Sequence, residues 1–187
     1  MFYPNYDVNN ITRWVKNGYI IKLKRGWYAF TECIQDRDMA LLIANQITEP
    51  SYISLHYALA FYGMIPETII QLTSVTTKKT ARYENAIGVF TYQTITPRLF
   101  FGYQPLSITN SYNGGRIYTI ATPEKALLDL LYLHPEYQTE DDFVQLRLDE
   151  DFMLYELNQA RLNEYLQRWN SPQLNKRVKL LLKAYNI

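Results

Sequence analysis

The sequence predicts an α/β (α+β) protein with a small N-terminal module, a mixed domain with a β-sheet flanked by helices, and a helical C-terminal third. Two patterns predict this class. Helical periodicity near the N-terminus leads into β-rich runs, which recur through the middle of the chain, and helical periodicity returns after residue 122. Hydrophobic residues are 48% of the 187 residues and charged residues 20%, which indicates a globular protein with one large or two small domains.

The N-terminal module divides at Gly18. Before Gly18, apolar residues recur at helical spacing: Val8, Ile11, Trp14 and Val15. Asp7 is placed to cap this helix and Gly18 to end it. Residues 19–23 and 27–30 are β-rich, and the basic turn 24–26 joins them as a hairpin. A short amphipathic helix followed by a basic hairpin is the second half of a winged helix-turn-helix.

We therefore expect a partial N-terminal winged helix-turn-helix that spans residues 1–35, followed by a second domain over residues 36–187. Only six residues precede Asp7, whereas a complete module has one or two helices before its recognition helix. We expect either a shortened module or packing against the second domain in place of those helices.

The polar residues of this module are of the kinds that bind DNA. Asn and Arg side chains pair bidentately with adenine and guanine edges, and cations on a hairpin bind phosphates. The expected DNA contacts on the helix are Asn9, Asn10, Arg13, Lys16 and Asn17, and those on the hairpin are Lys22, Lys24 and Arg25. Trp14, Tyr19 and Trp27 are expected to pack helix and hairpin together. The alternative is a solvated helix beside a solvated hairpin.

Charge is strongly segregated along the chain, although the net charge is only +1. Asp7 is the one acidic residue between positions 1 and 30, against five basic residues. Eight acidic residues between positions 136 and 156 face only Arg147, and the chain is basic again from Arg161 onward. Because a phosphate backbone responds to the local field, the low net charge does not exclude nucleic acid as a partner.

The second domain is expected to begin with a helix over residues 36–47, which ends before Pro50. Ser54 is expected to cap a helix that ends at Gly63. Strands are expected over residues 69–77, 89–95, 98–101 and 117–120. A polar turn with Lys78, Lys79 and Arg82 is expected between the first two strands, and Asn113-Gly114-Gly115 is expected to form a hairpin turn before the last.

Four helices are expected in the C-terminal third. Thr122 is placed to cap the first, with Pro123 at its first position. Thr139 is expected to begin the second, with acidic residues near its positive end. Residues 160–169 and 172–185 form the third and fourth, and Ser171 caps the fourth.

Patterns of an active site or a metal site are not found in the sequence. His56 and His134 are expected to be interior or capping residues, and Lys125 and Asp129 to form an ion pair on a helix surface. The acidic residues between positions 141 and 151 are expected to be solvated. The single cysteine, Cys33, has no metal-ligand partner pattern. We expect no catalytic residues, no metal and no cofactor.

No stretch approaches the roughly 20 apolar residues that span a bilayer, and the N-terminus has no signal pattern. We therefore expect no membrane partner and a cytoplasmic location.

Five stretches together resemble the AbiEi-type antitoxins of bacterial abortive-infection (type IV) toxin–antitoxin systems. They are residues 14–28 (WVKNGYIIKLKRGWY), 52–55 together with 58–59 (YISL and AL), 62–67 (YGMIPE), 73–77 (TSVTT) and 121–129 (ATPEKALLD). The resemblance covers residues 11–132, and nothing after Tyr132 contributes to it. No single stretch is diagnostic, but the ordered set is fairly specific.

The resemblance implies an antitoxin and transcriptional autoregulator of a phage-defence operon. Its winged helix would bind double-stranded operator DNA, and its larger domain would act against a separately encoded nucleotidyltransferase toxin, with or without direct contact. A second hypothesis stays open. In it the chain is a protein–protein interaction module that uses its acidic or sheet surface and does not bind DNA.

Overall fold

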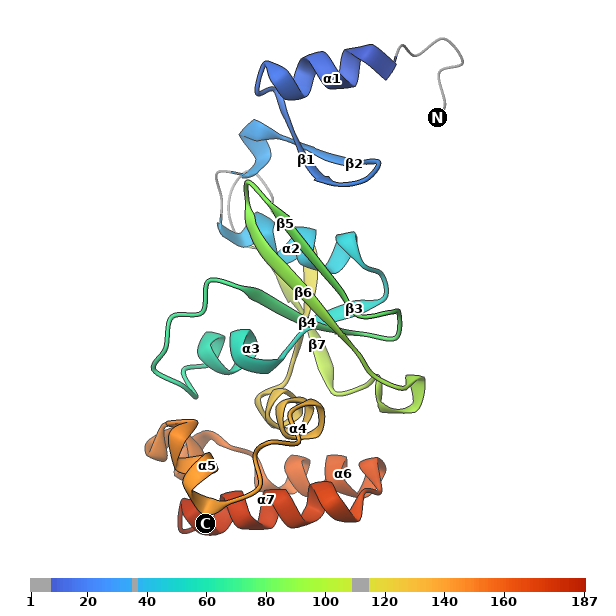
Figure 1. The fold of residues 1–187 in the computed structure, drawn as a ribbon. Coiled ribbons are helices and arrows are strands. Elements are labelled where there is room, and N and C mark those ends of the chain that lie inside the picture. Colours follow the sequence, from blue (N-terminus) through green and yellow to red (C-terminus); the bar gives the residue numbers. More distant parts are fainter. Residues whose placement is uncertain (1–7, 35–36, 109–114) are drawn as a thin grey trace.

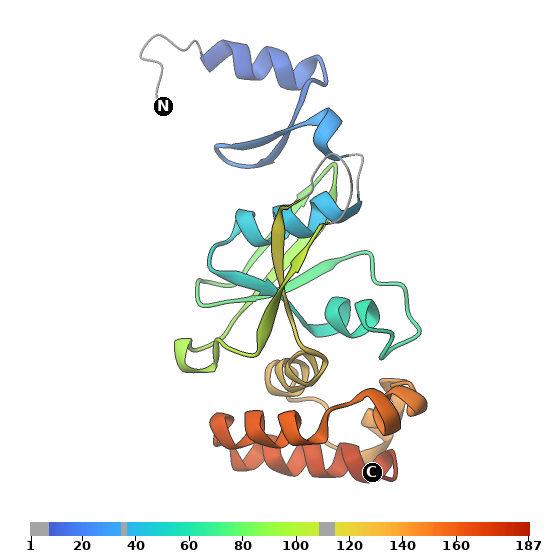
Figure 2. The same ribbon diagram turned by 180° about the vertical axis from the view of Figure 1, so that it is seen from behind.

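The computed structural model describes residues 8–34, 37–108 and 115–187 (Figure 1). The molecule is elongated, with a helix and a hairpin at one end, a β-sheet between helices in the middle, and a group of helices at the other end (Figures 1 and 2). The α/β class predicted from the sequence is confirmed. In the described ranges, none of the helices has the length and apolar character needed to cross a bilayer.

The N-terminal module contains α1 (Val8–Lys16), β1 (Ile20–Lys24), β2 (Trp27–Phe30) and the 3₁₀ turn η1 (Thr31–Ile34). Gly18 stops helix α1, as predicted, because it takes a left-handed φ of 73° two residues after Lys16. The N–H of Tyr19 then donates to the carbonyl of Trp14 at 3.0 Å. The expected cap Asp7 lies outside the described residues. Strands β1 and β2 pair antiparallel around a turn at Gly26, as the hairpin prediction required.

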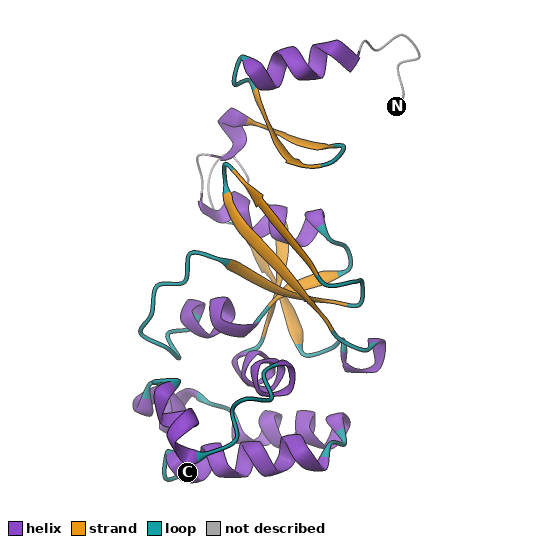
Figure 3. Ribbon diagram, viewed as in Figure 1, coloured by secondary structure: helices purple, strands orange, loops and turns teal. Residues whose placement is uncertain are grey.

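A mixed six-stranded sheet forms the centre of the described part of the chain, in the order β5-β6-β4-β3-β8-β7 (Figure 3). Its strands are β3 (Ser51–Ile53), β4 (Leu72–Thr76), β5 (Ala81–Asn85), β6 (Gly88–Thr94), β7 (Tyr103–Ser107) and β8 (Ile117–Ala121). Strands β4 and β6, and strands β3 and β8, pair parallel. The other three pairs are antiparallel, so the sheet combines hairpins with crossovers.

Helices cover both faces of this sheet (Figure 1). Helix α2 (Arg37–Ile47) covers one face, where the hydroxyl of Tyr92 in β6 donates to the carbonyl of Ala44 at 2.6 Å. Helices α3 (Leu55–Phe61) and α4 (Pro123–Leu133) lie on the opposite face. The hydroxyl of Thr122 accepts a hydrogen bond from the N–H of Lys125, which confirms the predicted cap of α4.

The C-terminal helices pack beneath α4 (Figure 2). They are α5 (Glu140–Gln145), the π-helical turn η3 (Phe152–Glu156), α6 (Gln159–Trp169) and α7 (Pro172–Ala184). Thr139 and Asp142 form a capping box at the start of α5, and Ser171 caps α7, as the sequence predicts. The buried indole of Trp169 lies between α6 and α4, with its ring centroid 5.5 Å from that of Tyr132.

The strand prediction is wrong at four places, one of which is β3, a strand that the sequence did not predict. Residues 98–101 lie in and after a 3₁₀ turn, Pro97–Leu99, not in a strand, because proline begins that turn. The polar turn predicted with Lys78, Lys79 and Arg82 does contain the two lysines, but Arg82 lies in β5, an edge strand whose Arg82 and Glu84 face solvent. Strand β7 was not predicted because it contains Pro105, which an edge strand tolerates. The predicted turn at residues 113–115 lies almost wholly outside the described residues.

The sequence predicts that Lys125 and Asp129 form an ion pair on a helix surface. This prediction is wrong, because the pair lies in the interior, with both side chains inaccessible to solvent. The carboxylate of Asp129 also accepts from the hydroxyl of Tyr52 at 2.9 Å and from that of Ser54 at 2.8 Å. Ser54 does precede α3, but its hydroxyl makes no capping hydrogen bond to that helix. The network therefore joins α4 to β3 and to the start of α3.

Candidate nucleic-acid interface

Helix α1 lies at one extremity of the molecule and packs on the hairpin formed by β1 and β2, which we call the wing (Figure 1). The side of α1 that faces the wing is apolar, and an open hollow of about 210 Å³ is lined by residues of both. Its walls are Ile11, Trp14, Ile20, Tyr28, Ala29 and Phe30. The prediction that Trp14 belongs to this contact is confirmed. Tyr19 and Trp27, which were also expected there, do not line the hollow and are 62% and 44% exposed.

Polar residues occupy other positions of α1 and its end. Asn10, Arg13 and Asn17 recur at spacings of three and four residues, which places them along one side of a helix. The guanidinium of Arg13 donates to the side-chain oxygen of Asn10 at 3.1 Å. Arg13, Lys16 and Asn17 are exposed, and Asn10 is half-buried. The side chain of Asn9 lies outside what the structure describes.

Lys22 and Arg25 are the exposed cations of the wing. Arg25 stands at the turn between β1 and β2, and Lys22 lies two residues before the end of β1. Glu32 is the one acidic residue in the sequence between Val8 and Ile34. The helix and the wing therefore present a local excess of positive charge, as the sequence predicts.

Lys24 faces away from solvent toward the body of the protein. Its ammonium donates to the backbone carbonyl of Ile47 at the end of α2. The same ammonium lies 4.7 Å from the ring centroid of Trp27 and 5.8 Å from that of Tyr83 in β5. Lys24 was expected to bind phosphate, but in this structure it fastens the wing to the body.

A second contact holds the wing from the side of β5. The side-chain amide of Asn85 donates to the backbone carbonyl of Leu23 at 3.2 Å. Leu23 itself is buried in the main core. The contacts of Leu23 and Lys24 thus hold the wing against the sheet domain, which agrees with the expectation that packing on the second domain supports the module.

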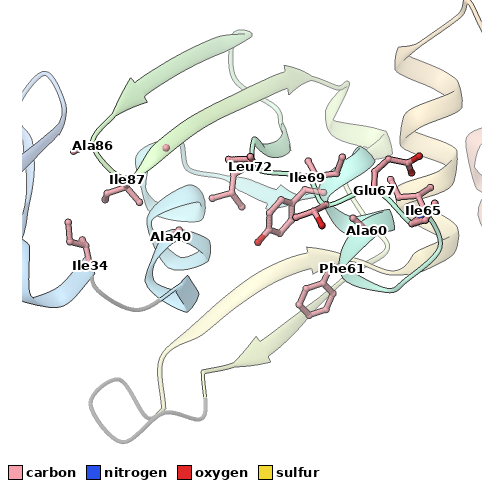
Figure 4. A pocket seen from close by; sticks show the side chains of 15 residues that line it. Ile34, Ala40, Ala60, Phe61, Ile65, Glu67, Ile69, Leu72, Ala86 and Ile87 are labelled. Atoms are coloured by element: carbon pink, nitrogen blue, oxygen red, sulfur yellow. The ribbon is translucent and has the colours of Figure 1, made fainter.

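An apolar groove of about 680 Å³ lies beside this junction (Figure 4). It is bounded by η1, α2, the loop after α3 and the turn between β5 and β6. Apolar residues form most of its wall: Ile34, Ala40, Ala60, Phe61, Ile65, Ile69, Leu72 and Ile87. Glu67 lies on the wall, and its carboxylate accepts from the guanidinium of Arg147 at 3.0 Å. The groove is an open hydrophobic surface beside the anchor of the wing.

The two histidines, which look isolated in the sequence, lie together. The ring centroids of His56 and His134 are 5.9 Å apart, beside a hollow of about 490 Å³ over β4, β5 and β6. His134 ends α4, as predicted, and is within hydrogen-bond distance of Glu136 at 2.8 Å and of Gln93 at 3.2 Å. Burial lowers the pKa of His56, and His134 lowers it further. The hydroxyl of Thr73 at this hollow donates to a backbone carbonyl, so it is not paired with an imidazole as a nucleophile would be.

The acidic residues between positions 141 and 151 are exposed or half-exposed, as predicted, and three acidic residues of this region also make structural contacts. Asp142 belongs to the capping box of α5, the carboxylate of Asp149 accepts from the N–H of Phe152 at 2.7 Å, and Glu140 pairs with Lys183. In residues 8–34, 37–108 and 115–187, no three His, Cys, Asp or Glu side chains are placed to hold one metal ion.

No protein-family model matches the chain, and a comparison with curated proteins gives no match. The likeness to AbiEi-type antitoxins therefore depends on the sequence stretches alone.

Proposed function

We propose that the protein binds double-stranded DNA through α1 and the wing. The observation that carries this proposal is the exposure of Arg13 and Lys16 on a helix at the end of the molecule and of Asn17 directly after it, beside a wing with exposed Lys22 and Arg25. Helices and hairpins of this kind bind the major groove and the flanking phosphates in winged modules.

The two parts of the module have different roles in this proposal. Arg13 reads a base edge, because guanidinium pairs bidentately with guanine, and its hydrogen bond to Asn10 limits the directions in which it points. Asn17 is the second base-reading side chain. Lys16, Lys22 and Arg25 bind phosphates and contribute affinity without sequence preference.

In the same proposal the protein is the antitoxin and autoregulator of a toxin–antitoxin operon. The support is the likeness of residues 11–132 to AbiEi-type antitoxins together with the exposed basic module. The test has two steps: to determine whether a gene beside this one encodes a nucleotidyltransferase, and to express that enzyme alone and with this protein. Growth arrest by the enzyme that is relieved by this protein is the expected result, and growth arrest without relief would refute the antitoxin role.

DNA binding is tested by fluorescence anisotropy with a duplex from the region upstream of the gene and a random duplex of equal length. Arg13→Ala should weaken binding to the upstream duplex by about 1–3 kcal/mol, which is roughly 5- to 150-fold, and should weaken random binding less. Lys176→Ala on α7 is the control, because Lys176 is exposed at the opposite end of the molecule. Equal losses on both duplexes would make Arg13 a phosphate contact.

The second candidate function is a protein-binding module without DNA binding. It is favoured by aromatic residues exposed on the same module, since Tyr19 is 62% exposed and Phe30 65%. Salt separates the two functions. DNA binding through basic groups weakens steeply with salt, with a log–log slope of about −0.9 for each neutralised phosphate. Absence of salt-dependent binding to any duplex would leave the protein-binding function.

A further inference from the structure

The turn between β4 and β5 carries two adjacent exposed lysines, Lys78 and Lys79. The expected contacts of the wing do not include them. Within the part of the chain that the structure describes, no ion pair joins either ammonium to an acidic side chain. Their charges are therefore available to a partner.

A chain of hydrogen bonds links this turn to the end of the wing. Lys24, next to Arg25, contacts the carbonyl of Ile47. The loop that follows Ile47 reaches Pro50, whose carbonyl accepts from the hydroxyl of Thr76 at 2.6 Å. The hydroxyl of Thr76 in turn accepts from the N–H of Lys78 at 3.1 Å.

The two opposite views agree with this path. The turn of the wing, the loop between α2 and β3, and the turn between β4 and β5 follow one another down the right side in Figure 1 and the left side in Figure 2. We call this side the basic edge and define it by Arg25, Lys78 and Lys79.

Acidic residues do not cancel the charge of the basic edge. Glu49 is exposed in the loop between α2 and β3, and Glu84 of β5 is paired with Arg82 at 2.9 Å. Among the residues that the structure describes, these three cations thus share this side with one carboxylate, that of Glu49, for which no ion pair is found. A duplex is a long rod with about one negative charge for each 1.7 Å of its axis, so it complements a row of cations that extends away from the wing.

We propose that the DNA held by α1 and the wing continues along the basic edge, where Lys78 and Lys79 bind its phosphates. This inference rests on the proposed DNA binding and adds a footprint beyond the segment that α1 reads. The added contacts are with phosphates, so they lengthen the bound site without extending the recognised sequence.

The experiment compares salt slopes on two duplexes. One is the shortest duplex that keeps the full effect of Arg13→Ala, and the other extends it by about one helical turn on each side. The double variant Lys78→Ala/Lys79→Ala should have a slope shallower by about 1.8 on the long duplex, since each lysine neutralises one phosphate worth about 0.9. On the short duplex its slope should equal that of the wild type.

The control is Lys176→Ala/Lys179→Ala, which removes the same charge from exposed positions on α7 at the opposite end. An unchanged slope on the long duplex would overturn the inference, as would equal shallowing by the control variant. Shallowing on both duplexes would also overturn it, because the lysines would then bind the segment that α1 reads. If the wild type binds no duplex in a salt-dependent way, the proposed function fails as well. If Arg13→Ala still weakens binding to the upstream duplex but Lys78→Ala/Lys79→Ala does not change the salt slope on the long duplex, this inference alone fails.

Discussion

The ammonium of Lys125 lies against the carboxylate of Asp129 one helical turn away, and neither side chain contacts solvent. The ammonium also donates to the hydroxyl of Tyr52 at 2.8 Å and lies 4.3 Å from the ring centroid of Trp169. Burial lowers the pKa of Lys125 and raises the pKa of Asp129, and each charge opposes the shift of the other. Two helices and a strand therefore meet around one enclosed pair of charges.

Replacement of one partner should be far more costly than replacement of both. Lys125→Met leaves the buried carboxylate of Asp129 without its countercharge, and we expect a loss of about 3–5 kcal/mol in the free energy of unfolding. The double variant Lys125→Met/Asp129→Leu should be less destabilised than the single one, because no buried charge remains. Urea denaturation of the three proteins measures the differences.

The matched control is an ion pair on the surface. Arg147 pairs with Glu67 at 3.0 Å, and the side chain of Arg147 is 67% exposed. Arg147→Met should therefore change the free energy of unfolding by at most about 1 kcal/mol. If Lys125→Met and Arg147→Met have the same effect, the interior pair does not stabilise the fold as described.

His56 should make stability depend on pH. Its pKa in the folded protein is lowered from the ordinary value of 6.5, first by burial and then by His134, while Glu67 and Glu136 oppose the shift. The unfolded chain therefore takes up the proton first as the pH falls. The contribution of neutral His56 is complete above pH 6.5 and is lost as the pH falls through the folded pKa.

The variant His56→Gln has no charge to gain at this position. Between about pH 7.5 and pH 5, its stability should fall less steeply than that of the wild type. Urea midpoints measured across this range give the difference between the two proteins, in which the titration of groups distant from His56 cancels. A difference that does not vary with pH would show that His56 protonates equally in the folded and unfolded states.

Local signals in the sequence predicted the elements that local contacts fix. Gly18 ends α1 through its own backbone angle, and Thr122 caps α4 through a hydrogen bond three residues along. Strand β5 could not be predicted in this way, because Arg82 and Glu84 resemble a polar turn until β6 pairs with them. The burial of Lys125 depends on Trp169 of α6, which no pattern around residue 125 indicates.

The same limit applies to the candidate site. The polar character of α1 can be read from residues 9–17, since helical spacing separates them from the apolar side. The direction of Lys24 cannot, because it is set by Ile47 and Tyr83, which are distant in sequence. In the sequence Lys22, Lys24 and Arg25 look equivalent, and only tertiary contacts distinguish the one that holds the wing.

This difference between Lys22 and Lys24 can be measured directly. Lys22→Met and Lys24→Met remove the same charge from the same strand, two residues apart. Lys22→Met should make the salt slope of DNA binding shallower by about 0.9, because an exposed phosphate contact is lost. Lys24→Met should leave the slope unchanged and speed amide hydrogen exchange in β1 and β2, because the tie to Ile47 is lost. Equal slopes for the two variants, with unaltered exchange in the wing, would contradict the anchoring role of Lys24.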